Sequence, residues 1–180
     1  MRNLNLILIA AVAVMILGSC TSDQETLKDE IDEIESNLFD NPKETMDKDS
    51  ARILVDKYVK YAEKNPEDSL ALDYMFKAAR VEVALGNYKD GLDLLNQIEE
   101  DYEGADEIAR ILLLKGIIFE DNLDNPEKAA ENYRKLIEKY PDNEYARDAQ
   151  HLLDNLGKSL QDLIDEFEKK NEGADTASVS

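Results

Sequence analysis

The stretch IARILLLKGIIFEDNLDNPEKAAENYRKLIEKYP, from Ile108 to Pro141, has the pattern of two antiparallel helices joined by a tight turn. From Ile111 to Phe119 the first helix is apolar on nearly every side, so it needs more than one neighbour to cover it. Asn125-Pro126 fits the turn, because asparagine caps a helix and proline is tolerated at the first helical position. The second helix has one apolar face, made of Ala129, Tyr133, Leu136, Ile137 and Tyr140.

This unit recurs along the chain. In three places an apolar or aromatic residue precedes a helix-ending residue by eight positions. The pairs are Tyr58 and Pro66, Leu95 and Glu103, and Tyr133 and Pro141. Small residues of paired helices also keep nearly the same separation: Ala79 and Gly91, Gly116 and Ala129. The period of about 37 to 38 residues is close to the 34 of a tetratricopeptide repeat.

At these positions the chain resembles the tetratricopeptide (TPR) family, strongly over one repeat and less strongly over the remainder of residues 50–158. The matching residues are the packing glycine, the following aromatic, the small residue of the second helix, its aromatic partner and the terminal proline: Gly116, Phe119, Ala129, Tyr133 and Pro141. Four positions depart from the family pattern: Leu112, Ala79, Asp154 and Glu103. The resemblance implies an all-α fold, a TPR-like α-solenoid of antiparallel helix pairs. Unrelated helical hairpins are the alternative.

Composition sets bounds on function. The chain has 180 residues, with 41 acidic and 21 basic residues and a formal net charge of -20. A nucleic-acid partner is disfavoured, because binding to phosphates requires a basic face. One histidine and one cysteine cannot build a disulfide framework or a Cys/His metal site within one chain. A length of 180 residues predicts one domain, and the histidine and cysteine counts predict no metal or cofactor.

Residues 1–19 are predicted to be a signal peptide, because Arg2 is followed by the apolar run Leu4–Leu17. The sequence Leu17-Gly18-Ser19-Cys20 resembles the lipobox of bacterial lipoproteins. In that family the cysteine carries acyl chains such as palmitate and becomes the first residue after cleavage. Each buried methylene contributes about 0.8 kcal/mol, so two or three chains hold a protein at a membrane. A secretory signal with an incidental cysteine is the alternative.

Residues 20–25 are expected to form a lipidated tether. Thr21 follows the cysteine, which by resemblance to a proteobacterial sorting rule favours the outer membrane, with the domain facing the periplasm. Asp23 and Glu25 leave a surface-export signal open.

Residues 26–170 are predicted to form the TPR-like helical domain. The first helix has the apolar face Leu27, Ile31, Ile34 and Leu38. Ser50 is expected to cap the next helix, whose face is Ala51, Leu54, Val55, Tyr58, Tyr61 and Ala62. Further helices are expected over 69–85, 88–102 and 145–156, the last with Ala146, Ala149, Leu153 and Leu156 inward.

A C-terminal capping helix is expected from Ser159 onward. It would cover the end of the stack with four apolar residues: Leu160, Leu163, Ile164 and Phe167. Residues 171–180 are small and polar, and we expect them to be a disordered tail.

The sequence contains little that indicates catalysis, and its acidic pairs are too abundant for any two to be singled out as an acid and base couple. His151 is the only histidine and Cys20 is assigned to the lipid, so no nucleophile stands beside a base. Asp121–Asn125 carries oxygen ligands but lacks the glycine and distal glutamate of a calcium loop, and a helix-ending turn explains it better. We predict that the protein is not an enzyme.

Three segments resemble the acceptor sequence of periplasmic O-glycosylation: Asp49-Ser50-Ala51, Asp68-Ser69-Leu70 and Asp175-Thr176-Ala177. The candidate glycosylation sites are therefore Ser50, Ser69 and Thr176. Ser50 and Ser69 are also suitable helix caps, which would explain both without a sugar.

In TPR proteins the first helix of each pair lines the concave surface. Carrying that register over gives eight candidate partner-binding residues: Asp73, Phe76, Arg80, Leu113, Ile117, Glu120, Asp148 and His151. Phe76, Leu113 and Ile117 would form an apolar strip suited to an extended peptide or a partner helix. The competing interpretation is that these three are core residues.

Two functions are consistent with these features. The first is a membrane-anchored TPR lipoprotein that acts as an interaction adaptor or assembly factor in the bacterial cell envelope, binding another envelope protein through a peptide or helix. It would broadly resemble BamD-type assembly lipoproteins and CpoB-type periplasmic TPR proteins. The alternative is an accessory lipoprotein that binds a small ligand or glycan in an acidic helical cleft. We prefer the first, because no cluster of aromatic and polar residues marks such a cleft.

Overall fold

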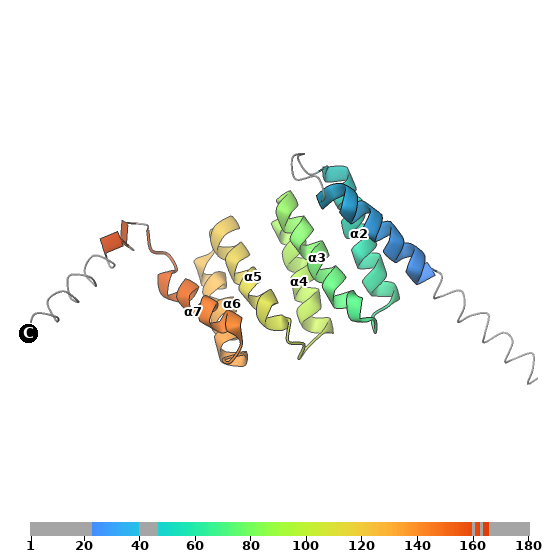
Figure 1. Cartoon of the computed structure of the whole chain (residues 1–180). Coiled ribbons are helices and arrows are strands. Elements are labelled where there is room, and N and C mark those ends of the chain that lie inside the picture. The colour runs from blue at the N-terminus through green and yellow to red at the C-terminus, as the bar shows by residue number, and fades with distance from the viewer. Residues whose placement is uncertain (1–22, 40–46, 160, 163, 166–180) are drawn as a thin grey trace, which may run out of the picture. The chain divides into compact units, whose positions relative to one another are not determined.

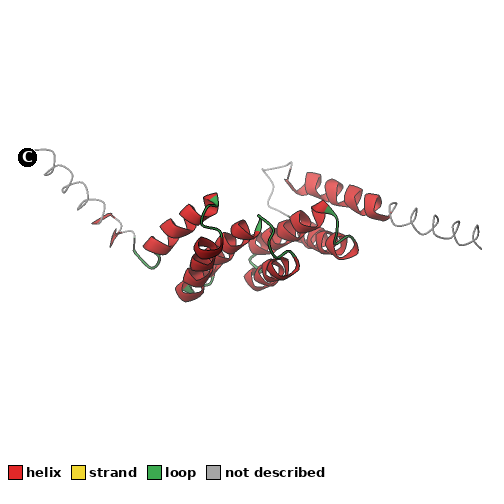
Figure 2. Ribbon diagram, turned by 90° about the horizontal axis from the view of Figure 1, so that it is seen from below, coloured by secondary structure: helices red, strands yellow, loops and turns green. Residues whose placement is uncertain are grey.

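The computed structural model describes residues 23–39, 47–159, 161–162 and 164–165. Every regular element in these ranges is a helix and no strand occurs in them (Figure 2), which confirms the predicted all-α fold of TPR-like helix pairs. The predicted signal peptide, Cys20, Thr176 and the tail lie outside the described residues. The chain divides into two compact units, Met1–Tyr102 and Glu103–Ser180, where its length had suggested one domain.

The N-terminal unit consists of a helical segment over residues 23–39 and three further helices: α2 (Lys48–Lys64), α3 (Ser69–Leu85) and α4 (Tyr88–Asp101) (Figure 1). Tight turns join the last three, and α3 packs against both α2 and α4. The buried face of α2 is the one predicted from the sequence: Ala51, Leu54, Val55, Tyr58, Tyr61 and Ala62.

Aromatic rings fill the core of this unit. The rings of Tyr58 and Tyr74 stack with centroids 5.3 Å apart, and Tyr61 meets Tyr74 edge-on at 4.8 Å. Leu27 and Ile31 of the first helical segment are buried in the same cluster. The ring pairs join α2 to α3, because they bury a large apolar area in a fixed geometry, and Leu27 and Ile31 add the first helical segment to the same core.

Two details at the start of this unit differ from expectation. Asp47, not Ser50, caps α2, because its carboxylate accepts hydrogen bonds from the Ser50 amide at 3.0 Å and the Ser50 hydroxyl at 2.5 Å. Residues 23–25, expected as tether, are helical. Gln24 Nε2 donates to Tyr61 Oη at 2.9 Å and to Asp68 Oδ2 at 2.6 Å, so side-chain hydrogen bonds tie this helix to α2 and to the start of α3.

The C-terminal unit contains α5 (Ile108–Ile117), the π-helical turn η1 (Ile118–Asn122), α6 (Pro126–Lys139) and α7 (Glu144–Asn155). α6 packs against both α5 and α7. As predicted, Asn125 caps α6, and its side chain accepts a hydrogen bond from the Lys128 amide.

Gly116 of α5 faces the ring of Tyr133 on α6. A Cβ atom at this position would stand 2.6 Å from Cδ1 and 2.9 Å from Cζ of Tyr133, closer than van der Waals contact permits. Tyr133 is fully buried, so its ring occupies the space that the missing side chain leaves. The glycine and the tyrosine of the TPR pattern therefore act together as one packing contact.

The end of the first helix differs from a regular α-helix. In η1 the Leu123 amide donates to the Ile118 carbonyl at 3.2 Å, five residues back, and the Asn125 amide donates to the Phe119 carbonyl at 2.8 Å. Asp124 then adopts a φ of 47°, in the left-handed region that asparagine and aspartate tolerate. This wider turn leads the chain into the cap of α6.

A further helix begins after α7, as predicted. Ser159 and Asp162 cap each other, since the Ser159 amide donates to Asp162 Oδ2 at 2.9 Å and the Asp162 amide to Ser159 Oγ at 3.2 Å. Ile164 is 41% exposed, so the expectation that it covers the stack is wrong for this residue. The other three expected covering residues, Leu160, Leu163 and Phe167, lie outside the described residues or have no described side chain.

Candidate functional site

A cavity of about 320 Å³ lies on the N-terminal unit between the first helical segment, α2 and α3. Its lining residues are Glu35, Phe39, Tyr58, Lys77, Arg80, Val81 and Ala84. Phe39 is 51% exposed, and Arg80 is exposed and makes no ion pair with a described residue. The cavity thus joins an accessible aromatic ring with an accessible guanidinium group.

Glu35 and Lys77 form the polar centre of this cavity. Lys77 Nζ lies 3.0 Å from Glu35 Oε1 and 3.5 Å from Asp73 Oδ2, and Tyr58 donates its hydroxyl to the same Glu35 oxygen at 2.5 Å. The Lys77 ammonium also stands 5.3 Å from the ring centroid of Tyr74, within cation–π range. These contacts fix Lys77, and they leave Arg80 as the cation able to meet a partner.

The same contacts set the protonation of this site. Burial raises the pKa of Tyr58, and the hydrogen bond and charge of Glu35 raise it further. Burial and the charges of Asp32 and Glu35 raise the pKa of Tyr74 to about 12. Burial by itself would lower the pKa of Lys77, but Glu35 and Asp73 outweigh it and raise this pKa. Lysine and tyrosines are therefore all protonated at neutral pH.

Three of the predicted partner-binding residues lie on α3. Asp73 is half-buried and pairs with Lys77, and Arg80 lines the cavity. Phe76 is only 5% exposed, as the competing interpretation of a core residue predicts. Its side chain therefore offers little surface to a partner. The prediction that Phe76 belongs to an exposed apolar strip is therefore wrong.

The other five predicted residues belong to the C-terminal unit. Leu113 and Ile117 of α5 are half-buried, while Asp148 and His151 of α7 are exposed. Glu120 of η1 is half-buried, and its Oε2 accepts a hydrogen bond from the Tyr133 hydroxyl at 2.7 Å. Glu120 is thus held in place by Tyr133, the residue that packs against Gly116.

Three lining residues of this cavity were not predicted from the sequence: Glu35, Phe39 and Lys77. A signal existed for Lys77, because it follows Asp73 by one helical turn and precedes Arg80 by nearly one, which places all three on one face. Glu35 had no such signal, since its contact with Lys77 joins residues far apart in the chain. Only the fold brings this carboxylate to α3.

The two described acceptor-like serines differ in their surroundings. Ser50 is half-buried, and its hydroxyl donates to Asp47. Ser69 is exposed at the first position of α3, and the capping side chain there belongs to Asp68, which accepts from the Leu70 amide at 2.8 Å. Ser69 is therefore the more accessible hydroxyl.

Within the described part of the chain, no group of histidine, cysteine, aspartate or glutamate side chains is arranged to hold a metal ion. The helices described there also include none with the length and apolar character needed to cross a membrane.

Residues 110–143 match the family model described as tetratricopeptide repeat. This range runs from α5 to the turn before α7 and contains both Gly116 and Tyr133. A search of curated proteins found no match. The match, together with the antiparallel helix pairs, identifies the chain as a protein that contains a tetratricopeptide repeat.

Proposed function

We propose that the protein is a TPR lipoprotein, anchored at the outer membrane through Cys20, that binds another envelope protein as an adaptor or assembly factor and catalyses no reaction. The repeat over residues 110–143 carries the protein-binding part, because such repeats suggest protein–protein interaction. The anchoring part is supported by the sequence Leu17-Gly18-Ser19-Cys20 after an apolar run. The cavity beside Arg80 supplies a contact point on the N-terminal unit.

Fractionation of native cells tests the anchor. The wild-type protein should partition into detergent with outer-membrane markers, whereas Cys20→Ala should remain an unprocessed precursor or become soluble. Recovery of wild-type protein in the soluble fraction would contradict the lipoprotein assignment.

Co-purification from detergent-solubilised membranes tests partner binding. Arg80→Glu should lose the partner that wild-type protein retains, because it reverses the accessible charge beside Phe39. Arg52→Glu is a matched control, since Arg52 is an exposed arginine on α2 that does not line this cavity. Equal retention by wild type and Arg80→Glu would remove the cavity from the partner site. A co-purifying glycan or small molecule in place of a protein would favour the alternative function, an accessory lipoprotein with a ligand cleft.

We propose Ser69 as the foremost glycosylation site, since it is exposed and Ser50 is held by Asp47. Intact-mass measurement on protein from the native host should show a mass above that of the lipidated chain, reduced in Ser69→Ala and unchanged in Ser50→Ala. A wild-type mass equal to the lipidated chain alone would reject modification at all three predicted sites, Thr176 included.

A further inference from the structure

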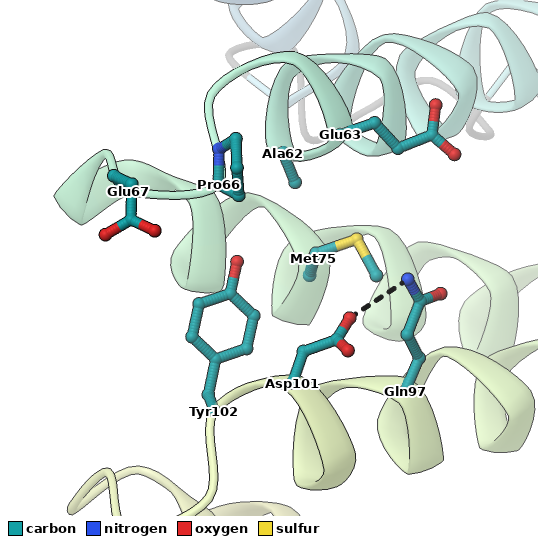
Figure 3. Close-up of a pocket in the computed structure, with 8 residues that line it drawn as sticks. All are labelled: Ala62, Glu63, Pro66, Glu67, Met75, Gln97, Asp101 and Tyr102. Atoms are coloured by element: carbon teal, nitrogen blue, oxygen red, sulfur yellow. Dashed lines mark hydrogen bonds between the residues drawn. The ribbon is translucent and has the colours of Figure 1, made fainter.

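A second cavity of about 320 Å³ opens between the C-terminal end of α2, the turn after it, α3 and the C-terminal end of α4. Its lining residues are Ala62, Glu63, Pro66, Glu67, Met75, Gln97, Asp101 and Tyr102. Figure 3 shows Met75 between the row Glu63, Ala62 and Pro66 above it and the row Gln97, Asp101 and Tyr102 below it. Met75 is only 2% exposed, so the apolar surface open to a partner is that of Pro66 and Tyr102, with carboxylates on both sides.

The charge of this cavity is not balanced. It is lined by three carboxylates, those of Glu63, Glu67 and Asp101, and by no lysine or arginine. None of the three makes an ion pair with a residue that the structure describes. The cavity beside Arg80 differs, because there Lys77 and Arg80 accompany Glu35. A cavity near the first helical segment likewise combines Asp23 and Glu30 with Lys60 and Lys64.

The end of α4 adds negative potential to the same place. A helix C-terminus carries a partial negative charge, which basic residues in the last turn usually offset. The last turn of α4 has no basic residue, and Asp101 is its final residue. Tyr102 lies in this negative potential: burial raises its pKa, and the charges of Asp101 and Glu67 raise it further. Asp101 accepts a hydrogen bond from Gln97 Nε2 at 3.3 Å, but no basic residue of the last turn offsets the negative potential at this end of the helix.

A bare metal ion does not fit this arrangement. No group of three or more acidic, histidine or cysteine side chains in the described ranges can hold one, so the three carboxylates do not converge on a single point. A guanidinium or ammonium group on a long aliphatic stem fits better, because the stem can lie on apolar atoms while the head reaches separated carboxylates. The net charge of -20 would also steer a basic segment toward the protein.

We propose that this cavity binds an arginine or lysine side chain from a basic segment of a partner protein. The aliphatic stem lies on the exposed ring of Pro66 and the half-buried ring of Tyr102, and the cationic head lies among Glu63, Glu67 and Asp101. This inference rests on the proposed function, because it specifies the chemistry of the protein partner that the proposed function requires.

Peptide binding tests the inference directly. The probe is a fluorescein-labelled, end-blocked Gly-Ser peptide with a central Arg-Ala-Arg, and its control carries citrulline in place of arginine, which keeps the shape and removes the charge. Citrulline should weaken binding by about tenfold or more, since hydrogen bonds to charged groups contribute about 1.5–3 kcal/mol. Equal binding of both peptides would overturn the proposal.

Two triple variants separate a site from overall charge. The cavity variant carries Glu63→Gln, Glu67→Gln and Asp101→Asn. The control variant carries Asp29→Asn, Glu33→Gln and Asp56→Asn, which removes the same charge from exposed positions outside this cavity. The cavity variant should lose about tenfold in affinity and the control variant only a small part of that, because well-separated surface charges are screened. Equal losses would mean steering by net charge without a site, and would overturn the proposal.

Co-purification distinguishes failure of this inference from failure of the proposed function. If the cavity variant keeps the native partner, the inference is wrong and the adaptor function stands. If wild-type protein retains no protein partner at all, the adaptor function itself fails.

Discussion

The α3–α4 and α5–α6 helix pairs place their small buried residues in opposite order. The α3–α4 pair places Ala79 on its first helix and Gly91 on its second, whereas the α5–α6 pair places Gly116 first and Ala129 second. All four residues are buried. Each pair therefore carries one buried alanine and one buried glycine, and the glycine lies on the second helix of the α3–α4 pair but on the first helix of the α5–α6 pair.

The atoms that face the two glycines differ in freedom. A Cβ at Gly116 would collide with the ring of Tyr133, which is fully buried and hydrogen-bonded to Glu120. A Cβ at Gly91 would lie 2.8 Å from Cγ2 of Val83, a half-buried side chain, and 3.1 Å from the Ala79 carbonyl oxygen. Both pairs thus place glycine against close neighbours, and they differ in how rigid the atoms opposite the glycine are.

The largest expected effect is that of Gly116→Ala. Because the new methyl group must displace the Tyr133 ring, we expect a loss of about 2–3 kcal/mol in the free energy of unfolding, near the upper end of overpacking costs. Urea unfolding followed by circular dichroism measures this loss. Amide hydrogen exchange should place the weakened protection in α5 and α6, and unchanged stability would show that the two helices are not in this register.

Removal of single tyrosine hydroxyl groups should destabilise the two units by different amounts. Tyr133→Phe should cost about 1–2 kcal/mol, since it leaves Glu120 without a charge-assisted hydrogen bond. Tyr58→Phe should cost less, because Glu35 keeps its ion pair with Lys77 at 3.0 Å. Both values come from urea unfolding. A larger loss for Tyr58→Phe would contradict the compensating role of Lys77.

The sequence predicted the parts of the fold that depend on local periodicity. The buried face of α2 and the Asn125 cap of α6 follow from residue spacing alone, and both are confirmed. The match to the TPR family covers the α5–α6 pair, where glycine and tyrosine stand in the family positions. In the α3–α4 pair the glycine has moved to the second helix and Leu95 replaces the tyrosine, so the same crossing carries a weaker signature.

The parts that depend on distant contacts could not be predicted. Glu35 reaches Lys77 only because the first helical segment packs beside α3. The π-helical turn after Ile117 has no periodic signature, because one extra residue in a single turn leaves the apolar spacing nearly unchanged. Asp47 displaced Ser50 as the cap because a carboxylate can accept from both the amide and the hydroxyl of that serine. Burial of Phe76 likewise depends on tertiary packing.

Alkaline pH should weaken both units through their buried tyrosines. Burial and a neighbouring glutamate raise the pKa of Tyr58 and Tyr133 in the folded protein. Their stabilising contribution is complete below the unfolded pKa near 10 and is lost as pH rises toward the folded pKa, because the unfolded chain releases its protons first. The loss between pH 9 and 10.5 should be about 0.8 kcal/mol per tyrosine.

Urea midpoints measured across this pH range test the alkaline effect. Each Tyr→Phe variant should show a shallower decline than wild type, while lysine deprotonation affects all variants alike. Parallel declines in all three proteins would mean that neither phenol holds its proton more tightly when folded.

The smallest expected effect is that of Gly91→Ala, the counterpart of Gly116→Ala in the other crossing. Alanine favours the helix over glycine by about 1 kcal/mol, which opposes the clash of the new methyl group with Val83. Since Val83 is half-buried it can shift away, so we expect a net change of about 0.5 kcal/mol or less in the same urea experiment. If Gly91→Ala instead costs as much as Gly116→Ala, the limiting atom is the Ala79 carbonyl oxygen, which cannot move without its helix. The two crossings would then be equally strict, and glycine rather than any small residue would be required on one helix of each pair.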